Sequence, residues 1–135
     1  MNTQGLPLLV ARLLIALMFV GAGISKLTGL AGTAGYIASV GLPAPQLLAI
    51  GAGVLELAAG VLIIVGWQAR WAALALAGFT LIATFIFHRY WALPAEQQMM
   101  QQLLFMKNLA ITGGLLFVFA FGAGTFALDA RRAAA

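Results

Sequence analysis

The chain has 135 residues, of which 64% are hydrophobic and 7% are charged, and it contains no cysteine. A soluble domain has about a quarter charged residues, so this composition excludes that class and predicts an integral membrane protein. The net charge of +4 comes from basic residues scattered singly, apart from Arg131 and Arg132. This spacing argues against nucleic-acid binding and favours contact with anionic lipid. Without cysteine, the chain excludes thiol-disulfide chemistry and an iron–sulfur cluster held by its own thiolates.

Four apolar runs each approach the roughly 20 residues that a helix needs to cross a bilayer. In chain order they are Leu6 to Leu27, Gln46 to Gly66, Trp71 to Tyr90 and Leu103 to Phe121. We therefore expect residues 1–135 to form a single domain, an all-α integral membrane four-helix bundle.

The segments that connect the spans give two further predictions. Residues 28–45 are rich in glycine and proline, but Tyr36 and Val40 are spaced to form a short interfacial segment between helices 1 and 2. Before the fourth span, Pro94 is followed closely by Glu96, a pattern typical of a helix start. The fourth helix is therefore predicted to begin outside the bilayer.

The distribution of basic residues predicts an orientation. With four spans, both termini lie on the same side of the membrane, and that side carries more positive charge. Its basic residues are Arg12, Arg70, Arg131 and Arg132, against Lys26 and Arg89 on the other side. The positive-inside rule then places both termini in the cytoplasm of a multi-pass protein of the inner (cytoplasmic) membrane.

An acidic residue lies deep in the second span. Glu56 is about ten residues, or roughly 15 Å, from either end, which is too deep for a carboxylate to reach water along the helix. Ala49, Gly53 and Gly60 share its helical face. This stripe is predicted to pack against other helices.

Basic and polar residues on the other helices can approach Glu56. Arg12, Ala16, Phe19, Gly23 and Lys26 form a similar stripe on the first helix, and Arg12 is expected within roughly 6 to 9 Å of the depth of Glu56. The hypothesis is a buried polar cluster centred on Glu56. Arg12 stands on one side of it, with Lys26, His88, Lys107 and Asn108 on the other.

Each polar residue also has a structural interpretation. The basic side chains can snorkel to the interface, and Glu56 can form a structural ion pair or bind a helix carbonyl as a protonated acid. His88 suits an interfacial anchor, so no haem is expected. No metal site is expected either, because Glu56 and His88 differ in depth by roughly 13 to 15 Å.

Glycine and phenylalanine have simple interpretations in this sequence. The membrane glycines are interpreted as close-packing points between helices. These glycines are Gly21, Gly23, Gly51, Gly53, Gly60, Gly113 and Gly114. The phenylalanines are assigned to lipid contact or to the core rather than to a ligand pocket. They are Phe79, Phe85, Phe87, Phe117, Phe119 and Phe121.

Several motifs follow one another along the chain. They are Arg12 with residues 21–26, Gly41-Leu42-Pro43 with Pro45, residues 56–60, Gly66 and Arg70, His88, residues 105–110 before Gly113-Gly114, and the ending at 122–129. In this order they resemble the DoxX family of small four-helix membrane proteins over nearly the whole chain. Within that ending, Thr125 stands where arginine is common in the family, and Ala127 where serine is common.

The resemblance implies an association with redox enzymes, since the family is named after a quinol oxidase subunit and relatives look like parts of thiosulfate:quinone oxidoreductases. It implies a membrane subunit of a quinone-linked oxidoreductase system with quinone as the cofactor. Under that hypothesis the candidate catalytic residues are Glu56, Arg12 and Lys107. The candidate cofactor-binding residues are Lys26, His88 and Asn108.

Two other functions remain open. The bundle could be a non-catalytic membrane anchor or assembly protein that recruits a soluble redox partner, with the polar cluster fixing helix register. It could also be a small transporter, although the broken half-helices typical of transporter sites are not evident. Small-residue stripes on more than one helix make a homo-oligomer plausible.

Overall fold

The computed structural model describes residues 5–133 and confirms an all-α membrane protein. Four helices are long and apolar enough to cross a membrane. They are α1 (Gly5–Thr28), α3 (Pro45–Val65), α4 (Ala69–Phe87) and α5 (Ala95–Phe121). The shorter elements are α2 (Leu30–Ser39), the 3-10 turn η1 (Tyr90–Ala92) and α6 (Leu128–Ala133).

The helix ends differ from the predicted spans for local reasons. Helix α3 stops at Val65 because Gly66 adopts a left-handed backbone with φ of 69°. Helix α4 ends at Phe87, and Tyr90 belongs to the short turn η1 instead. Helix α5 starts directly after Pro94, well before the apolar run that marked it in the sequence. The predicted interfacial segment is the ten-residue helix α2.

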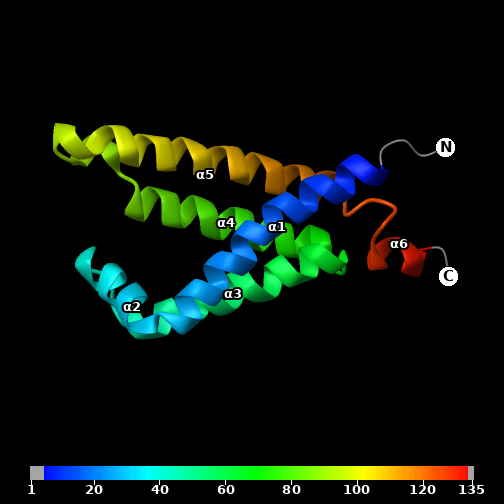
Figure 1. The fold of residues 1–135 in the computed structure, drawn as a ribbon, viewed down its shortest axis with the longest axis horizontal. Coiled ribbons are helices and arrows are strands. Elements are labelled where there is room, and N and C mark those ends of the chain that lie inside the picture. The colour runs from blue at the N-terminus through cyan, green and yellow to red at the C-terminus, as the bar shows by residue number, and fades with distance from the viewer. Residues whose placement is uncertain (1–4, 134–135) are drawn as a thin grey trace.

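The long helices are arranged as two pairs. Helix α1 packs along α3, and α4 packs along α5. Figure 1 shows the pairs close together at the end where α1 begins and α6 lies, and diverging toward the end where α2 lies. The site described below lies in the region where the pairs diverge.

Small side chains dominate the core, which lets the helices approach closely. Ala16 on α1 and Ala59 on α3 are buried, as are Ala69 and Ala73 on α4, and Leu115 on α5 is completely inaccessible. The α3 stripe predicted from the sequence is confirmed, since all four of its members are buried. Alanine at these positions brings the backbones near one another, so the polar groups on the same faces come within reach.

The closest approach of α1 and α3 is at Gly23. A methyl group added there would lie 2.6 Å from the backbone nitrogen of Leu57 and 2.8 Å from the carbonyl oxygen of Gly53. Neither backbone atom can move without separating the helices. Gly60 also packs against backbone atoms of α1, and Gly114 packs against the side chain of Ile15, but Gly21, Gly51 and Gly113 have open space around them. For these last three, the sequence interpretation as packing points within the chain was wrong.

We expect Gly23→Ala to destabilise the protein by about 2–3 kcal/mol, because the added methyl group overpacks a backbone contact. Unfolding by SDS titration of the purified protein measures this change. Gly21→Ala is the matched control, since nothing lies within 4 Å of the added methyl group. It should be neutral or stabilising by up to about 1 kcal/mol, as alanine has the better helix propensity. Equal stability of the two variants would contradict the close contact.

Candidate functional site

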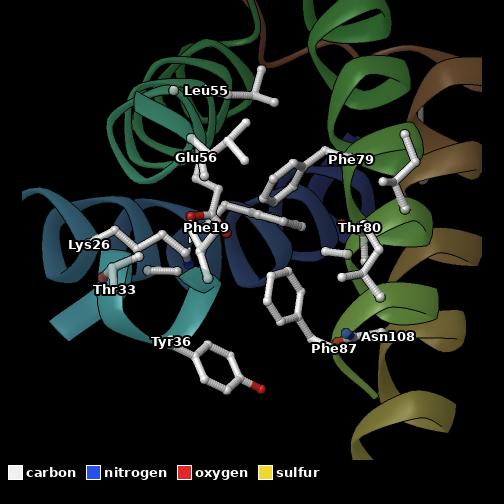
Figure 2. Close-up of a pocket in the computed structure, with 18 of the residues that line it drawn as sticks. Phe19, Lys26, Thr33, Tyr36, Leu55, Glu56, Phe79, Thr80, Phe87 and Asn108 are labelled. Carbon is white, nitrogen blue, oxygen red and sulfur yellow. Dashed lines mark ion pairs between the residues drawn. The ribbon is translucent and has the colours of Figure 1, made fainter. Parts of the chain in front are cut away.

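A cavity of about 590 Å³ lies between the diverging helix pairs, and all five helices from α1 to α5 contribute to its wall. Most of the lining side chains are apolar, as the close-up in Figure 2 shows. Leu47 and Ile82 belong to the wall and are largely exposed, so the cavity reaches the outer surface of the bundle. Its size and apolar wall are typical of sites for small organic ligands.

An ion pair lies at this cavity. The ammonium nitrogen of Lys26, on the last turn of α1, is 2.8 Å from Oε2 of Glu56 on α3. Glu56 is 5% exposed. The close contact at Gly23, one turn before Lys26, holds the two helices near enough for this pair. The ammonium group of Lys26 is therefore the polar group that faces this buried oxygen.

Three further predicted residues line the same cavity, namely His88, Lys107 and Asn108. Nδ1 of His88 is 2.8 Å from Oε1 of Gln101. A hydrogen bond between these atoms requires the proton on Nδ1. The bond ties the end of α4 to α5 at the wide end of the molecule. Lys107 is exposed and Asn108 is half-buried, so α5 adds one exposed and one partly buried polar group to the wall.

Arg12 is not part of this group, and the predicted approach of Arg12 to Glu56 was wrong. Its Nη1 donates a hydrogen bond of 2.7 Å to the carbonyl oxygen of Ala123, and its Nη2 donates to that of Phe126. Arg12 does not line the cavity. Two carbonyl groups of the carboxy-terminal segment bind the Nη1 and Nη2 groups of Arg12, and Lys26 reaches Glu56 instead.

The carboxy-terminal segment, residues 122–129, also closes the turn between α3 and α4. The carboxylate of Asp129 accepts hydrogen bonds from the backbone nitrogens of Gln68 and Ala69 at 2.9 and 3.1 Å. Its own backbone nitrogen donates to the carbonyl of Gly66 at 2.8 Å. Arg12 binds backbone carbonyls of this segment, so the departures from the family pattern at Thr125 and Ala127 leave the contact intact.

Sequence reasoning missed several lining residues. Phe79 and Phe87 were assigned to lipid or core, yet both belong to the cavity wall. Tyr36 of α2 stacks on Phe87, with ring centroids 5.1 Å apart and an interplanar angle of 27°. Figure 2 shows both rings beside the cavity. The signal available in the sequence was the aromatic residue Tyr36 on the short segment at residues 28–45.

A buried hydroxyl group completes the polar wall. Thr80 of α4 lines the cavity and is 5% exposed, and its Oγ1 has no hydrogen-bond partner in the part of the chain that the structure describes. Sequence reasoning did not single it out, because threonine in an apolar helix normally bonds its own backbone.

Comparison with known proteins agrees with this architecture. The DoxX family model matches residues 7–89. The inner membrane protein YqjF of Escherichia coli is 39% identical over 127 residues, covering 93% of this chain and 92% of that protein. The inner membrane protein YphA of the same organism is 37% identical over 124 residues, covering 92% and 89%.

A shorter match joins the chain to the Surfeit locus protein 4 homolog of Schizosaccharomyces pombe, with 28% identity over 81 residues, 58% of this chain and 27% of that protein. No solved structure matches the chain. The family model covers more than half of the sequence, and the two bacterial relatives span nearly all of it. The chain therefore belongs to the DoxX family and is a multi-pass inner-membrane protein.

Proposed function

We propose that the cavity is a quinone-binding site and that the chain is a membrane subunit of a quinone-linked oxidoreductase system. The observation that carries the proposal is one apolar cavity, open to the outer surface of the bundle, that contains the Lys26–Glu56 ion pair. A lipid-soluble molecule with a small polar head group matches this combination.

The donors around the cavity suit a quinone head group. Quinone oxygens accept hydrogen bonds and donate none, so they need donors in the wall. Lys26 supplies an ammonium group, Thr80 a hydroxyl and Asn108 an amide, all from lining residues. The apolar remainder of the wall suits the ring and an isoprenoid tail. The residues present therefore fit the group.

Each polar residue has a distinct chemical task in this proposal. A bound quinone would supply the acceptance of two electrons and two protons. Glu56 can hold or release a proton at its carboxylate, and Lys26 can stabilise negative charge on a nearby oxygen. Glu56 also holds the Lys26 ammonium at the cavity, since without this ion pair a lysine near the helix end would extend toward water.

Electrons must come from outside the chain in this proposal. Acid, base and cation side chains move protons and stabilise charge, but they do not carry electrons between distant sites. A soluble redox protein or a second membrane subunit is therefore part of the proposed system. We place both termini on the cytoplasmic side, following the excess of basic residues there.

Photolabelling tests the binding site directly. We expect an azido-substituted ubiquinone, illuminated with the purified protein, to label peptides from α3 and α4 that line the cavity, with competition by excess decylubiquinone. Gly51→Phe should abolish this labelling, because Gly51 lines the cavity and open space surrounds it. Gly113→Phe is the control, since Gly113 also has open space but lies away from the cavity.

Label spread evenly over all helices and unchanged by Gly51→Phe would contradict a quinone site. A stable complex with a soluble enzyme and no quinone would then support the anchor function. Ion flux through the purified protein in liposomes would support the transporter function.

A further inference from the structure

The hydroxyl group of Thr80 is an exception among the buried threonines of this bundle. Thr84 donates from Oγ1 to the carbonyl oxygen of Thr80 at 2.6 Å, and Thr112 donates to that of Asn108 at 2.8 Å. Both follow the usual habit of threonine in helices, which bonds the carbonyl four residues earlier. Among residues 5–133, the Oγ1 of Thr80 has no hydrogen-bond partner, although Thr80 is 5% exposed, like Thr112.

Leaving this hydroxyl unpaired is costly. A buried polar group without a partner loses its bonds to water and gains nothing in return. Unpaired groups of this kind therefore call for an explanation such as a bound ligand. Thr80 lines the cavity that holds the Lys26–Glu56 pair. In Figure 2 it lies on α4, across the cavity from Glu56.

The two helix pairs bring these groups to opposite walls. Glu56 and Lys26 come from the α1–α3 pair, and Thr80 comes from α4. The side chains labelled between them are mostly apolar and aromatic, such as Phe19 and Phe79. A ligand with a flat apolar body and acceptor oxygens at its edge would satisfy both walls together.

We propose that Thr80 is a ligand-binding residue, whose hydroxyl donates a hydrogen bond to a carbonyl oxygen of the quinone head group, opposite the Lys26–Glu56 pair. This inference rests on the proposed function and adds to it a specific contact, between the Thr80 hydroxyl and one carbonyl oxygen of the head group. The donor on the α4 wall fixes which way the head group lies. The ligand then supplies the hydrogen-bond partner that this hydroxyl group lacks within the described residues.

Affinity for decylubiquinone, measured with the protein in lipid nanodiscs, tests the contact. We expect Thr80→Val, which keeps the shape and removes the hydroxyl, to weaken binding about tenfold. Thr80→Ser keeps the hydroxyl and should bind within about twofold of the wild type. Thr84→Val is the matched control, since its hydroxyl bonds backbone and the residue does not line the cavity. It should bind like the wild type.

Thermal unfolding without ligand gives a second readout. Thr80→Val should unfold no earlier than the wild type, because it replaces an unpaired buried hydroxyl with a methyl group. Thr84→Val should unfold earlier, because it loses a hydrogen bond. This pattern of stability kept and affinity lost is one that a purely structural threonine would not give.

The outcomes separate the inference from the proposed function. If the wild type binds decylubiquinone and Thr80→Val binds it equally well, the inference is overturned and the proposed function stands. If Thr80→Val instead unfolds as early as Thr84→Val, the hydroxyl is structural and the inference is again overturned. If the wild type does not bind decylubiquinone, both fail together.

Discussion

Replacing Arg12 with methionine should destabilise the protein by about 3 kcal/mol, as expected for hydrogen bonds from a charged group in a buried site. Arg12 is 3% exposed and donates to the carbonyls of Ala123 and Phe126. Methionine fills similar space but leaves both carbonyl oxygens without this donor. The carboxy-terminal segment should then detach from α1, which SDS-titration unfolding and protease sensitivity of residues 122–129 would both report.

Arg70→Met is the matched control for this effect. Arg70 also donates to backbone carbonyls, those of Phe119 and Ala120 at the end of α5, but its side chain is exposed. Water can replace an exposed donor, so the loss should stay below about 1 kcal/mol. Equal losses for the two variants would show that burial does not determine the role of Arg12. Quinone binding should survive in any folded Arg12 variant, because Arg12 does not line the cavity.

The fold was predictable because its signals are local. Hydropathy identified the four spans, and a helical spacing of three and four residues identified the buried faces of α1 and α3. Pro94 marked the start of α5, and the aromatic residue Tyr36 pointed to α2. Each of these features depends on neighbours within one or two turns of the same chain segment.

The partners of the charged groups were less predictable, since they depend on how whole helices are placed. Judged only by their depth in the membrane, Arg12 and Lys26 could both contact Glu56. The close contact at Gly23 decides in favour of Lys26, while the carboxy-terminal segment occupies Arg12. No local pattern encodes the contact of that segment with Arg12, because the contact uses backbone carbonyls that every residue carries.

The cavity could not be predicted from the sequence either. It lies where the two helix pairs diverge, and the lining residues come from five different helices spread along the sequence. Thr80 illustrates the consequence. As a residue type in an apolar helix it is ordinary, and it differs from Thr84 in lining the cavity and in having an unpaired hydroxyl group.

Glu56→Gln should abolish quinone retention while leaving the protein folded. Glutamine has nearly the same shape as glutamate, and Lys26 lies near the end of α1 with its side chain 29% exposed. The lysine can therefore extend toward the interface once its ion-pair partner is gone. The cavity then loses both its proton-exchanging group and its cationic donor, so we expect at least about a tenfold loss of bound quinone.

Glu96→Gln provides the matched control, because Glu96 lies exposed in the first turn of α5 and does not line the cavity. Like Glu56→Gln, this substitution removes one negative charge from the protein. Thermal unfolding of both variants should stay close to that of the wild type, which separates loss of binding from loss of fold.

The most direct test is the ratio of quinone to protein after gentle purification, measured by lipid extraction and mass spectrometry for the wild type, Glu56→Gln and Glu96→Gln side by side. A quinone site at Glu56 predicts near-stoichiometric quinone in the wild type and in Glu96→Gln, with quinone lost from folded Glu56→Gln. Quinone no higher than the membrane background in all three proteins would contradict it. So would equal retention in Glu56→Gln.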